Sequence, residues 1–201
     1  GVKHLNGTDY TVIPDRIEAG TYIMAAAITG GKVKVKNAIL DHMLAVQTKL
    51  LEAGVRITQD AGGLLVSVPN KLHASNITTS PYPGFPTDLQ AQYMSLMCVS
   101  EGTSIIRENI WENRFMHCSE LQRLGANIQI QEKSAIVTGC PSLSGAPVMA
   151  SDLRASAALA LAGLVAQGET TISRVYHLDR GYEKLEEKLS SLGARIQRVK
   201  E

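Results

Sequence analysis

The sequence contains few aromatic residues, almost no net charge and no long apolar run. Only two Phe and one Trp occur in 201 residues, which argues against a surface on which single-stranded bases stack. The formal net charge of +1 gives no sign of a nucleic-acid or acidic-membrane partner. The apolar stretches are too short to span a membrane and no signal peptide opens the chain, so we expect a cytoplasmic protein without membrane contact.

Cysteines and ligand motifs are also scarce. The three cysteines are Cys98, Cys118 and Cys140, an odd number without metal-like spacing, which is typical of reduced thiols in a cytoplasmic protein. Cys98 lies in an apolar stretch and should be a buried small hydrophobe. The sequence has neither a glycine-rich phosphate loop nor a metal-ligand cluster, so we expect no cofactor and no bound metal.

A threefold repeat organises the chain. At three points about 70 residues apart, an amphipathic helix ends at a glycine and an alternating strand pattern follows. These glycines are Gly54, Gly125 and Gly193. Three helices rich in small residues keep the same period, and they begin at Asp15, Asp88 and Asp152. They are apolar nearly all round, so we expect them to be buried.

Each repeat reads as strand, buried helix, strand, surface helix and β-hairpin. Hairpins are predicted over 55–68 and 126–138, whereas the third repeat offers only one hairpin strand, 194–199. That strand would leave an open edge. We therefore predict a single domain, 1–201, with repeats of about 8–70, 74–140 and 143–201. The missing strand would come from a preceding segment of a longer protein or from a partner.

The segment before Asp88 is rich in proline. Pro81, Pro83 and Pro86 should hold it extended. Thr87 and Asp88 should then begin a helix by accepting hydrogen bonds from its first N–H groups. Judged on these residues alone, Asp88 is a helix cap rather than a catalytic group.

Five motifs, in order along the chain, resemble the enolpyruvyl transferase family, and within it the UDP-N-acetylglucosamine enolpyruvyl transferases of bacterial cell-wall (peptidoglycan) synthesis. The motifs are 14–18, 85–92, 112–117, 151–156 and 179–182. The resemblance covers the whole chain. It implies an α/β fold, an inside-out α/β barrel of three βαβαββ repeats around buried helices, with the last strand of the third repeat lacking. It also implies a second domain that carries a reactive cysteine, and an N-terminal segment that supplies the lacking strand.

The resemblance implies transfer of the enolpyruvyl group of phosphoenolpyruvate to the 3′-hydroxyl of UDP-N-acetylglucosamine, with release of phosphate. The two substrates would be the partners, and this chain alone should fold without turning over. A 5-enolpyruvylshikimate-3-phosphate synthase-like domain is the alternative within the class. A non-catalytic interaction module is the alternative outside it, and its cleft should have lost its charged residues. An RNA-binding module is disfavoured by the charge and the few aromatics.

The resemblance also assigns roles to individual residues. Asp88 would be the general base at the sugar hydroxyl, a role compatible with capping. Arg180 would contact phosphoenolpyruvate and take part in catalysis, and Arg114, at the matching point of the second repeat, would bind substrate. The pattern places Arg180 at a helix start, where an ion pair with Asp179, Glu183 or Glu186 is the alternative.

Three further residues are assigned to substrate binding. Asp152 and Arg154 would orient groups in the cleft, and a structural ion pair between them is the alternative. Ile110 would contact the nucleotide sugar through its backbone, with a side chain in ordinary packing. Trp111 should be partly buried, and His117 should pack or bond locally rather than donate protons.

Overall fold

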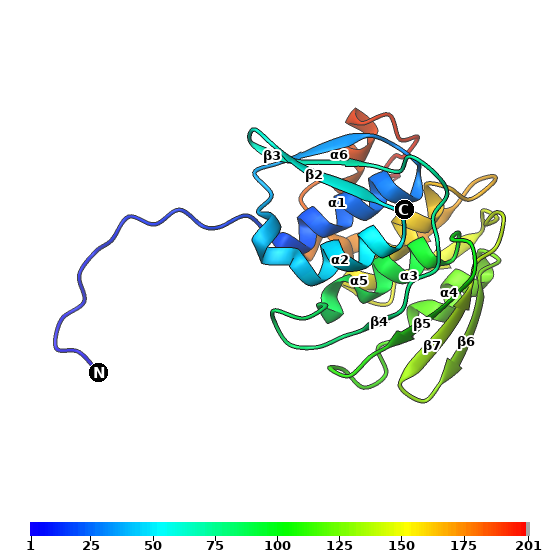
Figure 1. Ribbon diagram of the computed structural model, residues 1–201, viewed down its shortest axis with the longest axis horizontal. Coiled ribbons are helices and arrows are strands. Elements are labelled where there is room, and N and C mark those ends of the chain that lie inside the picture. The colour runs from blue at the N-terminus through cyan, green and yellow to red at the C-terminus, as the bar shows by residue number, and fades with distance from the viewer. Residues whose placement is uncertain (200–201) are drawn as a thin grey trace.

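The computed structural model describes residues 1–199. Three helices form its interior: α1 (Arg16–Ile28), α3 (Gln90–Met97) and α5 (Leu153–Gly163). They pack against one another (Figure 1), and most of their residues are buried. Small side chains, such as those of 25–27 and 155–158, let the helix backbones approach closely. The prediction of three buried helices is confirmed.

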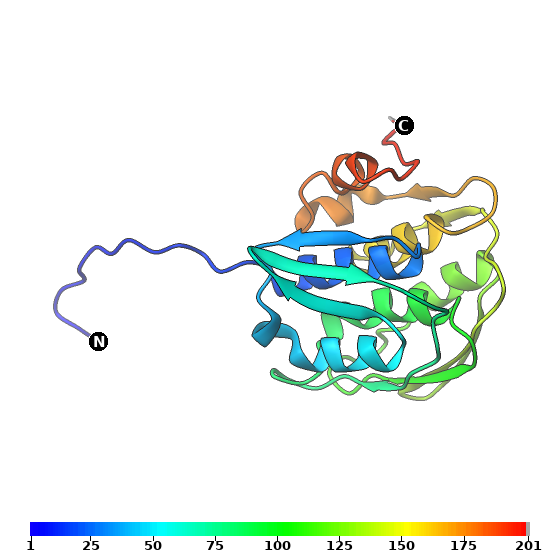
Figure 2. The same ribbon diagram turned by 45° about the horizontal axis from the view of Figure 1, so that its top comes forward.

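Three sheets surround these helices (Figure 2). The first holds β1 (Val33–Lys36), β3 (Gly63–Ser67) and β2 (Arg56–Asp60), in that spatial order and antiparallel. The second has the order β4 (Ile77–Thr78), β5 (Thr103–Arg107), β7 (Ser134–Thr138) and β6 (Asn127–Gln131). The third pairs β8 (Pro147–Met149) with β9 (Thr171–Ser173) in parallel. Both predicted hairpins, β2–β3 and β6–β7, are present.

Shorter helices lie toward the solvent. They are the 3₁₀ helix η1 (Leu40–Met43) with α2 (Leu44–Glu52), then α4 (His117–Arg123), and finally η3 (Val175–Arg180) with α6 (Leu185–Ser191). Each alternates buried and exposed positions, as predicted for surface helices. Helix α4 begins only at His117. Asn113, four residues earlier, has a left-handed backbone (φ 55°) that belongs to a turn.

The third sheet is smaller than the sequence suggested. Residues 194–199 form no strand, which corrects the prediction of a hairpin strand there. A strand is held by hydrogen bonds to a neighbouring strand, and within 1–199 no strand pairs with this segment. Instead, a groove of about 1160 Å³ opens between β9 and residues 193–199, with Tyr22 and Ala26 of α1 in its wall.

The residues before α1 extend away from the body of the protein (Figure 1) and are exposed. In the second and third sheets a short strand, β4 or β8, runs parallel to the strand that follows the buried helix. Over the described residues, the first sheet has no such strand beside β1. None of the helices in this part of the chain has the length and apolar character that a membrane crossing needs.

Candidate active site

Asp88 lies at the end of the buried helices, in the 3₁₀ helix η2 (Thr87–Leu89) that leads into α3. The next residue, Leu89, is fully buried against α1. A Cβ atom added to Gly20 of α1 would stand 2.5 Å from Cδ1 of Leu89, so any larger residue at position 20 would displace the Leu89 side chain. This packing fixes the turn that carries Asp88.

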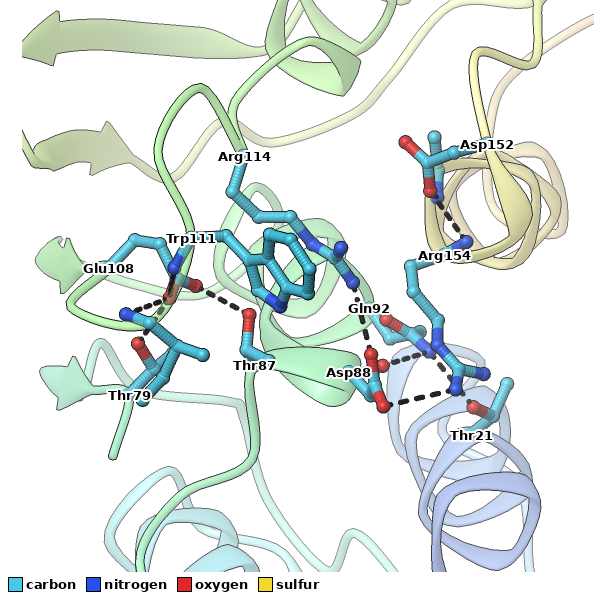
Figure 3. A network of polar contacts seen from close by, with 12 residues as sticks. Thr21, Thr79, Thr87, Asp88, Gln92, Glu108, Trp111, Arg114, Asp152 and Arg154 are labelled. Atoms are coloured by element: carbon cyan, nitrogen blue, oxygen red, sulfur yellow. Dashed lines mark hydrogen bonds and ion pairs between the residues drawn. The ribbon is translucent and has the colours of Figure 1, made fainter. Parts of the chain in front are cut away.

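Two guanidinium groups form ion pairs with the carboxylate of Asp88. Nη2 of Arg114 lies 3.1 Å from Oδ1, and Nη2 of Arg154 lies 3.2 Å from Oδ2, as Figure 3 shows. The two arginine side chains are 20% and 17% exposed, whereas Asp88 is 41% exposed. The charged groups therefore meet at the surface with their stems covered by protein.

Asp88 does not cap a helix, which corrects the interpretation from its own segment. The residue at the cap position of η2 is Pro86, and the side chain of Asp88 bonds to arginines instead. Charge-assisted bonds are stronger than those to neutral N–H groups. Asp15 and Asp152 do cap their helices: Oδ1 of Asp15 accepts from Ile17 N at 2.7 Å, and Asp152 caps α5.

The proline-rich lead-in is also not extended. It forms a closed turn, in which the N–H of Ser80 donates to the carbonyl of Phe85 at 3.0 Å and that of Gly84 donates to Pro81 at 2.8 Å. The guanidinium of Arg16 lies 5.1 Å from the ring centre of Tyr82 in this turn, a cation–π contact. The segment is thus held by its own hydrogen bonds and by α1.

Arg154 and Asp152 do not form the ion pair that was left open as an alternative. Asp152 accepts from the backbone N–H groups of Arg154 and Ala155, at 2.8 and 3.0 Å. Burial would raise the pKa of Asp152, but these two bonds and the nearby charge of Arg114 outweigh it and lower that pKa. Burial would likewise lower the pKa of Arg154, but its hydrogen bond to Asp88 and the charge of Asp88 outweigh it and raise that pKa. Both groups are therefore held charged at neutral pH.

A buried polar network underlies the ion pairs. The amide of Gln92 in α3 donates to the Asp88 carbonyl at 3.0 Å and lies 3.1 Å from the hydroxyl of Tyr182. That hydroxyl is 2.8 Å from Oγ1 of Thr21 in α1. Residues of α1, α3 and the segment after η3 thus meet beneath Asp88.

Within residues 1–199, neither Arg180 nor Ile110 forms a hydrogen bond or ion pair with this cluster. Arg180 is exposed at the last position of η3, which corrects the prediction of a helix start there. Its predicted alternative partner Asp179 instead bonds Arg198 at 2.6 Å. The side chain of Ile110 is 40% exposed and that of Trp111 is 59% exposed, so neither packs as expected, because both stand in a loop beyond the end of the sheet.

Sequence reasoning missed Glu108, which follows β5 and is 2% exposed. Its side chain accepts hydrogen bonds from Thr79 and Thr87 at 2.7 and 2.9 Å. A single glutamate after an alternating strand carries no signal of burial. Its bonding partners come from separate segments, so only the fold shows the connection.

His117 lies behind Arg114 at the start of α4 and is 2% exposed. Burial lowers its pKa from 6.5 to about 4; the charge of Asp152 opposes this shift and that of Arg114 adds to it. The side chain is therefore neutral near pH 7, which agrees with a local packing role.

The pKa of His117 predicts an acid-sensitive fold. Between about pH 4 and 6.5 the unfolded chain binds this proton and the folded chain does not, so stability falls as the pH is lowered through that window. The loss should approach about 3 kcal/mol. Urea unfolding at stepped pH should show this slope, and His117→Gln should flatten it. The exposed His73, changed to Gln, is the matched control; an unchanged slope in His117→Gln would contradict the assignment.

The cluster can bind anions. Guanidinium groups suit phosphate and carboxylate because their planar forks offer two parallel donors. Among the described residues, no group of His, Cys, Asp and Glu side chains is arranged to hold a metal. The arrangement is thus a carboxylate beside cationic anion-binding groups at one end of the buried helices.

The model of the family described as EPSP synthase (3-phosphoshikimate 1-carboxyvinyltransferase) matches residues 1–189. The chain belongs to the EPSP synthase family. Other members include two proteins named UDP-N-acetylglucosamine 1-carboxyvinyltransferase. The one from Granulibacter bethesdensis is 61% identical over 99% of this chain and 47% of the relative. The one from Myxococcus xanthus is 61% identical over 100% and 48%.

Solved structures of the EPSP synthase family share the fold. The enolpyruvyl transferase NikO from Streptomyces tendae has a TM-score of 0.86 and 32% identity over 94% of this chain and 45% of its own. EPSP synthase from Acinetobacter baumannii has a TM-score of 0.71 at 18% identity, over the same shares of the two chains, a likeness of fold alone. The predicted α/β class is confirmed. The chain spans about half the length of the curated relatives it matches.

Proposed function

We propose that this chain forms one half of the active site of an enzyme that transfers enolpyruvyl from phosphoenolpyruvate to the 3′-hydroxyl of UDP-N-acetylglucosamine, for peptidoglycan synthesis. The observation that carries the proposal is the carboxylate of Asp88 between Arg114 and Arg154. It occurs in a chain about 60% identical to relatives of that name. Those residues are the ones that the resemblance assigned to base and substrate contacts.

The chemistry follows from these groups. The transfer would begin with protonation of the methylene carbon of phosphoenolpyruvate and attack of the hydroxyl on the neighbouring carbon, and it would end with loss of phosphate and of one proton from the new methyl group. It requires an acid at the methylene carbon, a base at the hydroxyl, and cations for the phosphate and carboxylate. Asp88 would take the hydroxyl proton, and Arg114 with Arg180 would bind the anionic substrate. When that anion binds Arg114, the carboxylate of Asp88 loses an ion-pair partner and one of its oxygens is free to accept from the hydroxyl. Asp152 and Arg154 would orient the cleft, and the backbone of Ile110 would contact the nucleotide sugar.

The rest of the site would come from the other half of the protein. Sequence resemblance supports a second domain with a reactive cysteine and an N-terminal strand. The groove beside β9 suits such a strand, because one edge of β9 pairs with β8 and the other lines the groove. With that strand, 1–201 would complete a single domain, an inside-out barrel of three repeats. A cytoplasmic location and a reaction without cofactor or metal complete the proposal.

The acceptor distinguishes this function from 5-enolpyruvylshikimate-3-phosphate synthesis. The test uses a chimeric enzyme in which this chain replaces the matching half of the Granulibacter bethesdensis relative, and the chimera is supplied with phosphoenolpyruvate and either acceptor. We expect phosphate release and an enolpyruvyl product, identified by mass, with UDP-N-acetylglucosamine only. Transfer to shikimate 3-phosphate, or a folded chimera that transfers to neither acceptor, would contradict the proposal.

A further inference from the structure

Glu108 is a buried carboxyl group that the proposed chemistry does not use. Its side chain is 2% exposed. Its backbone N–H donates to the carbonyl of Lys133, in the β6–β7 turn, at 2.8 Å, so the second sheet fixes the position of its backbone. Glutamate is rarely buried unless its oxygens are bonded. The groups that bond it therefore indicate what it does.

The side chain of Glu108 accepts four hydrogen bonds (Figure 3). Oε1 accepts from the hydroxyl of Thr79 at 2.7 Å and from the N–H groups of Ile110 and Trp111 at 2.8 and 3.1 Å. Oε2 accepts from the hydroxyl of Thr87 at 2.9 Å. Within residues 1–199 no cation pairs with it. Four neutral donors around one carboxyl group hold separate segments of backbone in a fixed relation.

Two of these segments carry the proposed chemistry. Thr87 directly precedes Asp88, and Ile110 and Trp111 begin the loop that leads to Arg114. We propose that Glu108 is a positioning residue for enolpyruvyl transfer. It acts through Thr87 on the carboxylate of Asp88, and through the 110–111 backbone on the loop that carries Arg114. This inference rests on the proposed function, because it assumes that Asp88 and Arg114 meet substrates.

Position matters because proton transfer requires the base within hydrogen-bond reach of the hydroxyl. A displacement of about 1 Å can cost a factor of about 100 in rate. A leucine at position 108 offers no acceptor, so all four hydrogen bonds are lost. A glutamine can keep them, because its oxygen can accept from the backbone N–H groups of Ile110 and Trp111 while its NH₂ group donates to the hydroxyl oxygen of Thr87.

The test compares five single variants in the chimeric enzyme defined above. Glu108→Leu should lower kcat by roughly 10- to 100-fold, and Glu108→Gln should recover most of it. Thr87→Val, which removes only the hydroxyl, should also lower kcat, and Thr87→Ser should recover most of it. Thr103→Val is the matched control, because Thr103 lies at the other end of β5, where its hydroxyl bonds only that of Thr138, at 3.2 Å.

A purely structural role would lower the melting temperature of Glu108→Leu and leave kcat per folded enzyme unchanged, which would overturn the proposal. So would additive losses in the double variant of Thr87→Val with Glu108→Leu, because residues that act through one contact are not additive. If the unsubstituted chimera transfers nothing, the proposed function itself has failed. If it is active and Glu108→Leu equals it, only this inference has failed.

A second readout needs no turnover. Trp111 is the only tryptophan of the chain, and its backbone N–H donates to Oε1 of Glu108 at 3.1 Å. Its fluorescence anisotropy in this chain therefore reports the order of the loop. Glu108→Leu should lower the anisotropy, and Thr103→Val should not. Equal anisotropy in Glu108→Leu and the unsubstituted chain would show that the loop does not depend on Glu108.

Discussion

Asp88→Asn in the chimeric enzyme should lose turnover almost completely, with kcat falling by roughly 10²- to 10⁴-fold. The amide has the shape of the carboxylate but cannot take the proton of the acceptor hydroxyl. It also attracts Arg114 and Arg154 less strongly than the carboxylate that lies 3.1 and 3.2 Å from them. Phosphate release at saturating concentrations of both substrates measures the effect.

Folding must be checked in the same experiment, because Asp88→Asn leaves two partly buried guanidinium groups without their carboxylate. Circular dichroism and the melting transition provide this check. Asp60→Asn is the matched control, since Asp60 is also a carboxylate in an ion pair, 2.8 Å from Lys34, but lies on the exposed first hairpin. A kcat for Asp88→Asn within about threefold of the control would reduce Asp88 to a structural ion pair.

The sequence was sufficient for the buried helices and hairpins because each depends on local patterns. The run of small apolar residues in α5 and the alternation in β6 and β7 appear within a dozen residues. The segment 194–199 carries the same kind of pattern but forms no strand. A strand depends on its neighbour, and no local pattern reveals whether a neighbour is present.

The candidate site was predictable as a set of residues but not as a set of contacts. Asp88, Arg114 and Arg154 come from different repeats or different elements, and nothing in their spacing shows that both arginines meet one carboxylate. The capping interpretation of Asp88 was wrong for that reason, since the tertiary ion pairs replace the local bonds. Glu108 was missed because its donors, Thr79 and Thr87, are brought to it only by the fold.

The second large effect concerns this chain on its own. We expect the purified chain to fold and to release no phosphate from the two substrates above background. Asp88, Arg114 and Arg154 lie at the surface, with Asp88 41% exposed, and within residues 1–199 nothing covers them from outside. Catalysis by fixed charges depends on excluding water and on donors placed around the reacting group. The proposed second domain would supply both.

The isolated chain must be shown to be folded before its inactivity has meaning. A cooperative urea transition and native-like circular dichroism meet that need. The buried network of Thr21, Gln92 and Tyr182 joins α1, α3 and the segment after η3, so we expect the three helices to unfold together. If the isolated chain is unfolded, the loss of its fold accounts for its inactivity. The comparison would then require the chain to be stabilised first.

The central claim is that this chain holds one half of an enolpyruvyl transfer site that works only when closed by the other half. The most direct measurement is phosphate release from phosphoenolpyruvate and UDP-N-acetylglucosamine, by equal amounts of the isolated folded chain and of the chimeric enzyme. The account predicts release by the chimera that requires both substrates, and a rate at least about 10³-fold lower for the chain alone. Release by the isolated chain within about tenfold of the chimera would contradict it.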